Sequence, residues 1–254
     1  MKFLVWNVRR LGHSSKKSAV KDLTSKLYPS ILALLETKLP EPNFQSLRQV
    51  WGRRPSQWVS LPANGASGGI WVVWDLSFFT LNSHFIGEFL VTILLSYISD
   101  GTPLKFTVVH GPTSLVTRSR LWFIGKCSCS STPHLVSGRE FQCHPLVPRK
   151  KLGSRFTWSN HASNPILSKL DRFLLSLNWE ECFPRSSSLA LPKPTSDHCP
   201  ILLDTDVVQR GPGPFRFELH WLLEKDFSLL LHTWRNIPAS QVSGRAGYIL
   251  QTKL

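Results

Sequence analysis

An aspartate and a histidine stand side by side near the end of the chain, in the motif Ser196-Asp197-His198-Cys199-Pro200. An apolar run at residues 201–203 follows directly and predicts a buried strand. Histidine is the side chain whose ordinary pKa lies near neutrality, and a neighbouring carboxylate can shift that pKa or join the ring at a metal. The motif therefore predicts a proton-handling group at the edge of a sheet.

Four more polar residues follow or interrupt short apolar runs, and they fit one site with this pair: Asn7, Glu36, His110 and Asp171. Glu36 suits a metal carboxylate, because magnesium takes one or two carboxylates and keeps several waters. Asn7 can hold a metal or a water without adding charge, and Asp171 can orient the His198 ring. Phosphodiester hydrolysis needs such a set, with a hard cation, an activated water and stabilisation of developing charge.

Each of these residues also has a structural explanation. An Asn or Glu at a strand end commonly serves a turn, and the adjacent Asp197 and His198 can simply cap a strand. Asp171 can pair with its neighbour Arg172. Trp158 is expected in the core rather than as a platform on which a base stacks. Only the combination of these residues is informative.

The elements that must position these side chains are short. Strands are predicted over residues 2–8, 31–36 and 70–74, a hairpin over 89–98 and 104–109, and a helix over 18–27. Short strands with polar ends and few helices predict an α/β or α+β sandwich, in which such ends converge on one rim. No element can be placed over residues 121–155. Residues 209–214 are a predicted linker, and 217–234 a predicted amphipathic helix.

Composition narrows the class of protein. Thirty Lys and Arg against sixteen Asp and Glu give a net charge of +14, which favours a polyanionic partner such as nucleic acid. Five cysteines without a CxxC pair indicate neither a zinc module nor a secreted disulfide scaffold. The longest apolar stretch, interrupted by Glu88, is too short to span a bilayer. We expect an intracellular, soluble protein with no membrane partner, located in the nucleus if it is expressed.

Five stretches together resemble the endonuclease/exonuclease/phosphatase superfamily, and within it the apurinic-endonuclease-like domain of plant LINE-type (non-LTR) retrotransposons. They are Trp6-Asn7-Val8-Arg9 with Leu11-Gly12; Glu36-Thr37-Lys38-Leu39; Ser67-Gly68-Gly69-Ile70 with Trp74-Asp75; Phe156-Thr157-Trp158-Ser159-Asn160 with Leu170-Asp171-Arg172-Phe173-Leu174; and Ser196-Asp197-His198-Cys199-Pro200. The stretch from Phe215 to Trp221 resembles the segment that leads from that endonuclease towards the reverse transcriptase. The resemblance covers most of residues 1–120 and 155–236.

The resemblance implies a four-layer α/β sandwich, with two packed β-sheets flanked by helices, that cuts DNA with Mg²⁺ or Mn²⁺. By matching motifs, Asn7, Glu36 and Asp197 would be metal-side residues, with Asp197 also beside the phosphate, and Asp171 would pair with His198. His110 stands where the family usually has a phosphate-contacting Tyr, and it can still donate a hydrogen bond. Residues 1–206 would form this domain, with 121–155 aberrant, and 207–254 a linker and truncated segment towards a reverse transcriptase.

The family's middle motif, Gly-Asp-Phe-Asn, does not occur in this chain. The nearest stretch is Ser137-Gly138-Arg139-Glu140-Phe141-Gln142. Glu140 and Gln142 carry the same pattern of charge, but each is one methylene longer than the Asp and Asn of the motif, and productive geometry tolerates little displacement. Codons compatible with residues 138–150, read one base later, can spell Gly-Gly-Asn-Phe-Asn-Val-Ile-Arg-Trp-Ser-His-Glu-Lys. We therefore interpret the segment as a frameshift that entered near Leu121 and was corrected near Lys151.

The function expected from these observations is a metal-dependent DNA endonuclease domain, derived from a retrotransposon, with impaired catalysis. One alternative is a non-catalytic, basic remnant that only binds nucleic acid. Another is an exonuclease or phosphatase of the same superfamily.

Overall fold

The computed structural model describes residues 1–65, 67–111, 134–139, 147–148, 151–153, 156–160 and 162–206. The chain divides into two units, Met1–Val207 and Val208–Leu254, and every described residue lies in the first. The linker predicted at 209–214 and the helix predicted at 217–234 lie outside the described residues, as do Glu140 and Gln142.

The first sheet contains seven strands. In spatial order they are β10 (Lys151–Gly153), β14 (Ser187–Ala190), β15 (Ile201–Asp204), β1 (Lys2–Asn7), β2 (Ile31–Leu35), β4 (Ile70–Asp75) and β3 (Ser56–Leu61). β1 runs parallel to β2 and antiparallel to β15. The ends of β1 and β2 and the beginning of β15 therefore lie at one edge of this sheet.

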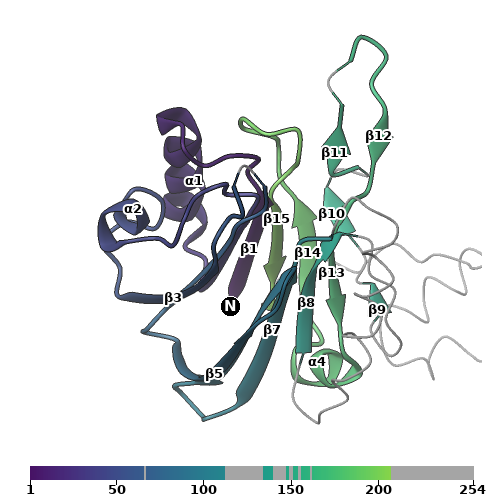
Figure 1. Cartoon of the computed structure of the whole chain (residues 1–254). Coiled ribbons are helices and arrows are strands. Elements are labelled where there is room, and N and C mark those ends of the chain that lie inside the picture. The colour runs from purple at the N-terminus through teal and green to yellow at the C-terminus, as the bar shows by residue number, and fades with distance from the viewer. Residues whose placement is uncertain are drawn as a thin grey trace, which may run out of the picture. The chain divides into compact units, whose positions relative to one another are not determined.

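The second sheet contains six strands. In spatial order they are β5 (Phe79–Ile86), β6 (Leu90–Tyr97), β7 (Pro103–Val109), β8 (His134–Arg139), β13 (Asp171–Leu175) and β9 (Val147–Pro148). β7 and β8 are parallel, and β13 runs antiparallel to β8. A separate two-stranded hairpin, β11 (Trp158–Ser159) and β12 (Leu167–Ser168), rises beyond one end of the two sheets (Figure 1).

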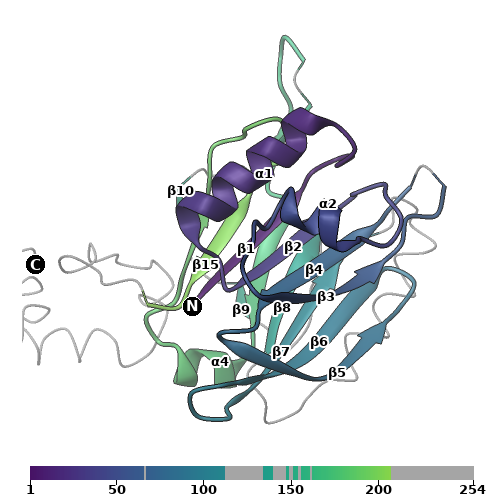
Figure 2. The same cartoon turned by 90° about the vertical axis from the view of Figure 1, so that its left-hand side faces the viewer.

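The main hydrophobic core lies between the two sheets. Because side chains alternate along a strand, Phe3 and Val5 of β1 face the second sheet and pack with residues such as Phe106. Leu4 and Trp6 face the other way, against the helical layer. Figure 2 shows that layer, α1 (Ser14–Leu27) and α2 (Phe44–Arg48), across the outer face of the first sheet. The fold is thus an α/β sandwich, as the sequence predicted.

The short helix α4 (Leu177–Cys182) packs at the end of the sandwich where β1 begins. Its Trp179 meets Phe3 edge to face, with ring centroids 5.5 Å apart. This end is opposite to the one at which Asn7 terminates β1. Among the described residues, no helix has the length and apolar character needed to cross a membrane.

The predicted strands correspond to β1, β2, β4, β6 and β7 within one or two residues. Three differences stand out. The first helix begins at Ser14 rather than at residue 18, and α2, β3 and β5 were not predicted. Residues 121–155, where no element could be placed from sequence, supply β8 to the second sheet and β10 to the first.

Candidate active site

The topology brings the ends of strands from both sheets to one rim. In the first sheet, Asn7 ends β1 and is in register with Leu35, the last residue of β2, so that Glu36 follows beside it. Asp197 and His198 precede β15 at the same edge. In the second sheet, His110 follows the end of β7, and Asp171 begins β13. All six residues predicted for the site therefore lie at this end of the sandwich.

Glu36 is the centre of one group of contacts. Asn7 Nδ2 donates to Glu36 Oε1 at 2.8 Å, and His110 Nε2 lies 3.2 Å from the same oxygen. Arg9 Nε lies 3.8 Å from Oε2. Burial raises the pKa of Glu36, but His110, Asn7 and Arg9 outweigh it and bring that pKa to about 2. Glu36 is therefore an ionised carboxylate at neutral pH.

Asp171 and His198 form a second group. His198 Nδ1 lies 2.8 Å from Asp171 Oδ2, and the histidine side chain is fully buried. The backbones of both residues are also held by hydrogen bonds. Thr157 Oγ1 accepts the backbone N–H of Asp171 at 2.9 Å, and Trp6 Nε1 donates to the carbonyl of His198 at 3.0 Å. The two sheets are thus joined at the rim by a carboxylate and an imidazole.

Asp197 lies on the other side of Asn7 from Glu36. Its Oδ2 accepts Trp158 Nε1 at 2.7 Å and contacts Arg9 Nη1 at 3.0 Å. Trp158 was expected in the core, but it is half-buried and its indole N–H fixes this carboxylate. Ser196 Oγ donates to the backbone carbonyl of Asn7 at 2.8 Å, which ties the Asp197 segment to β1.

The loops that carry these residues have an unusual backbone. Arg9, Arg10, Glu36 and Lys38 have positive φ angles of 43°, 79°, 52° and 54°. Non-glycine residues rarely adopt this left-handed region, and such strain gathers at functional sites. Lys16 Nζ holds the first loop by donating to the carbonyls of Val8 and Arg9, both at 2.6 Å. Local strain is therefore concentrated in the segments that follow β1 and β2.

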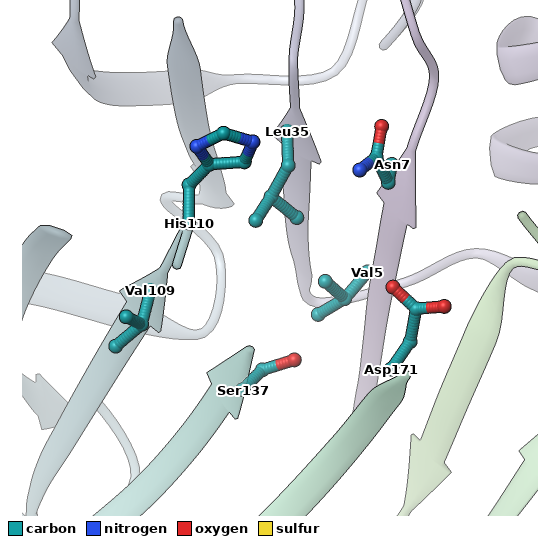
Figure 3. A pocket seen from close by; sticks show the side chains of 7 residues that line it. All are labelled: Val5, Asn7, Leu35, Val109, His110, Ser137 and Asp171. Carbon is teal, nitrogen blue, oxygen red and sulfur yellow. The ribbon is translucent and has the colours of Figure 1, made fainter. Parts of the chain in front are cut away.

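A small open pocket lies between these groups (Figure 3). Its walls are Val5, Asn7, Leu35, Val109, His110, Ser137 and Asp171, so that apolar and polar side chains from both sheets meet in it. Ser137 Oγ, on β8, is buried and has no hydrogen-bond partner among the described residues. β8, the first described strand within residues 121–155, thus reaches this pocket.

The donor atoms at the rim suit a hard cation. In the described part of the chain, no three His, Cys, Asp or Glu side chains form a group that could hold a metal. Glu36 and Asp197 nevertheless supply carboxylate oxygens on either side of a guanidinium, and Asn7 supplies an amide oxygen. Magnesium needs only one or two carboxylates because it keeps several waters, so this set fits it.

Sequence reasoning found six residues of this rim and missed three others, Arg9, Lys16 and Trp158. Arg9 and Trp158 lay in the motifs that were recognised, but only the folded chain places them against Asp197. Lys16 carried no signal, because its contacts are with backbone carbonyls of a loop whose shape no sequence pattern predicts.

No family model and no curated protein matches the sequence. Solved structures do match. D. rerio TDP2 complexed with a single-strand DNA product has 13% identity and a TM-score of 0.61, over 80% of this chain and 97% of that one. An endonuclease/exonuclease/phosphatase from Bacteroides vulgatus has 13% identity and a TM-score of 0.59, over 80% and 97%.

The AP endonuclease LMAP from Leishmania major has 16% identity and a TM-score of 0.56, over 80% of this chain and 86% of that one. At such low identities the likeness shows the fold. The chain has the α/β sandwich of the endonuclease/exonuclease/phosphatase type, and its structural neighbours are members of that superfamily.

Proposed function

We propose that this chain is a divalent-metal-dependent DNA endonuclease domain of a plant LINE-type retrotransposon, in which catalysis is impaired. The observation that carries the proposal is that two side-chain contacts lie at the same end of the two sheets. Glu36 contacts Asn7, and Asp171 contacts His198. The fold neighbours support the choice of substrate, since one holds a single-strand DNA product and another is an AP endonuclease. The domain would comprise residues 1–206, and the segment 207–254 would lead towards a reverse transcriptase.

Glu36, Asn7 and Asp197 would hold the Mg²⁺ or Mn²⁺ ion. When bound, the ion supplies charge neutralisation on the phosphate and activation of a water. Glu36 can serve this role at neutral pH because its pKa of about 2 keeps it ionised. The Asn7 amide contacts Glu36 Oε1 at 2.8 Å and so fixes the direction of that carboxylate.

His198 would contact the phosphate or move a proton. When Nδ1 carries a proton, it donates to Asp171 Oδ2 across 2.8 Å, and this contact fixes the orientation of the ring. His110, 3.2 Å from Glu36, would contribute a hydrogen bond to the phosphate from the second sheet. The chemistry would then take place between the two sheets.

Impairment would come from the segment that replaces Gly-Asp-Phe-Asn. The missing Asp and Asn position the nucleophile and the transition state in the family, and residues that act as a unit do not compensate for one another. The nucleotide sequence tests the origin of this segment. If codons 138–150 do not spell the family's middle motif in the next frame, the frameshift hypothesis is wrong.

Plasmid nicking by the full chain with Mg²⁺ or Mn²⁺ tests the activity, with Glu36→Gln as the matched control. We expect slight nicking that Glu36→Gln abolishes. Robust nicking by the native chain that depends on Glu36 would contradict the impairment. Nicking that Glu36→Gln leaves unchanged would contradict the proposed site. Release of mononucleotides or of inorganic phosphate would favour exonuclease or phosphatase chemistry.

The second candidate is a remnant that binds nucleic acid without cutting it. The net charge of +14 favours this function, because a basic protein neutralises phosphates and releases counterions. It predicts DNA binding that weakens steeply with salt and no metal-dependent cleavage. Binding measured across a series of salt concentrations, beside the nicking assay, separates the two candidates.

A further inference from the structure

The side chain of Arg9 lies between two carboxylates that come from different elements. Its Nη1 lies 3.0 Å from Asp197 Oδ2, and its Nε lies 3.8 Å from Glu36 Oε2. The order of the sheet explains this position. β1 lies between β15 and β2, so a residue just beyond β1 can reach Asp197 on one side and Glu36 on the other.

The loop is shaped to keep Arg9 there. The residue takes a left-handed backbone conformation with φ 43°, its N–H donates to Asn7 Oδ1 at 3.2 Å, and its carbonyl accepts Lys16 Nζ at 2.6 Å. The two carboxylate side chains are only 12% and 11% exposed, whereas the side chain of Arg9 is 48% exposed. The anions are therefore fixed in the rim, while the cation between them can move into solvent.

Two nearly buried carboxylates on one rim repel each other unless a cation lies between them. Either a guanidinium or a divalent metal ion can reduce the repulsion between the two carboxylates. Because these two cations repel each other, binding of one between the carboxylates weakens binding of the other. We propose that Arg9 is a built-in counter-cation, which holds Glu36 and Asp197 in place in the metal-free protein and competes with the divalent ion for them. Arg9 is then a positioning residue that sets metal affinity.

This inference rests on the proposed function only in taking Glu36 and Asp197 as metal-side residues. It is tested by binding rather than by cleavage. Mn²⁺ is titrated into the metal-free full chain, and free Mn²⁺ is followed by electron paramagnetic resonance. We expect Arg9→Gln to bind Mn²⁺ roughly 3- to 30-fold more tightly than the native chain, because it removes both the competitor and a positive charge.

Arg10→Gln is the matched control. It removes the same charge one residue away, from an exposed side chain in the same left-handed loop. We expect it to change Mn²⁺ affinity by less than about threefold, since a charge in solvent is well screened. Arg9→Lys keeps the charge but is too short and too compact to bridge two carboxylates, so its affinity should lie between those of the native chain and Arg9→Gln.

A thermal melt without metal provides a second measurement. Arg9→Gln should lower the melting temperature more than Arg10→Gln does, and saturating Mn²⁺ should remove the difference. The inference is wrong if Arg9→Gln binds Mn²⁺ no more tightly than Arg10→Gln, or if no variant binds Mn²⁺. Tighter binding by Arg9→Gln without any nicking would support the inference and contradict the endonuclease function. Nicking together with equal Mn²⁺ affinities of Arg9→Gln and Arg10→Gln would contradict the inference and support the endonuclease function.

Discussion

At the scale of single residues, Glu36 illustrates how neighbours decide what a side chain can do. Its backbone has a positive φ of 52°, and its carboxylate contacts Asn7, His110 and Arg9. Burial alone would favour the neutral acid, but these contacts favour the ionised form and lower the pKa from 4.5 to about 2. The same contacts that keep the Glu36 carboxylate ionised therefore also stabilise the fold.

A dependence of stability on pH follows from this shift. A carboxyl whose folded pKa lies below its unfolded pKa contributes stability above the unfolded value, and this is lost as pH falls through the folded value. For Glu36 the window runs from about pH 4.5 down to about pH 2. We expect native chain and Glu36→Gln to differ in free energy of unfolding by a constant amount above this window.

Within the window the native chain should lose about 1–3 kcal/mol relative to Glu36→Gln, a range already reduced for partial exposure of the carboxylate. Urea unfolding at a series of pH values measures the difference. A difference that stays constant from neutrality to the acid limit would show that Glu36 is not held as an anion by its contacts.

Arg10 gives a second prediction at this scale. Its φ of 79° is the most positive among the described non-glycine residues, and its side chain is exposed. Glycine adopts such a conformation without steric cost, whereas an L-residue with a Cβ pays about 1–2 kcal/mol. Arg10→Gly should therefore raise stability by roughly 0.5–1 kcal/mol, after the larger chain entropy of glycine in the unfolded state is subtracted.

Thermal and urea unfolding check this prediction. Lys21→Gly, in the middle of α1, is a useful comparison because the same kind of change in a helix should destabilise by about 0.5–1 kcal/mol. A loss of stability in Arg10→Gly would mean that the loop after β1 does not hold residue 10 in the left-handed region.

The position of a residue at the rim was predictable from sequence where the residue adjoins an apolar strand. Asn7, Glu36 and His110 are marked by the runs that precede them, and Asp197 and His198 by the strand that follows. Arg9 was not assigned and Trp158 was expected in the core, because their contacts depend on distances to Asp197 across the fold. A local sequence pattern indicates where a strand ends. It does not show which charged side chain contacts which carboxylate in the folded chain.

At the scale of elements, buried strands were predictable from local sequence patterns, whereas edge strands were not. β1, β2 and β4 are buried along nearly their whole length and read as continuous apolar runs. β3 and β5 lie at the edges of their sheets and are largely polar or exposed, so neither shows a clear pattern. α2 spans only Phe44–Arg48, too short for a helical period, and its one signal was the capping box of Asn43 and Ser46.

The turn between β3 and β4 matters because it supports the Glu36 loop. Thr37 N–H donates to the carbonyl of Gly69 at 3.1 Å, and Lys38 N–H to that of Gly68 at 3.1 Å. A Cβ added at Gly69, which has φ 88°, would lie 2.4 Å from Thr37 Oγ1, whereas a Cβ at Gly68, with φ 72°, would meet nothing within 4 Å. Both glycines thus have the left-handed backbone that disfavours other residues, but only at Gly69 would a Cβ also collide with a neighbouring side chain.

Gly69→Ala and Gly68→Ala form a matched pair. We expect Gly68→Ala to cost about 1–2 kcal/mol, the penalty of the left-handed backbone alone. Gly69→Ala should cost a further 1–3 kcal/mol or so from the collision with Thr37, and should also shift the Glu36 loop. Urea unfolding measures both, and the Mn²⁺ titration shows whether the loop has moved. Equal costs would contradict the close contact.

At the scale of the whole molecule, the rim exists only because two sheets pack with their strand ends aligned. Asn7, Glu36, Asp197 and His198 belong to the first sheet, and His110 and Asp171 to the second. β8 places Gly138 beside Val109 and Arg139 beside Asp171. β8 therefore ends at the rim, although it belongs to the segment in which no element could be placed from sequence.

This geometry allows a direct test of the proposal that impairment arises in the segment that follows β8. Residues 138–150 are replaced by Gly-Gly-Asn-Phe-Asn-Val-Ile-Arg-Trp-Ser-His-Glu-Lys, which places a motif of the family's type at the end of β8. Because general acid–base and electrostatic groups each contribute about 10²–10⁴-fold, we expect metal-dependent plasmid nicking to rise by at least about 10²-fold. Glu36→Gln in the same background should abolish the gain. A replaced chain that folds, binds Mn²⁺ and nicks no faster than the native one would contradict the proposal that impairment arises in this segment.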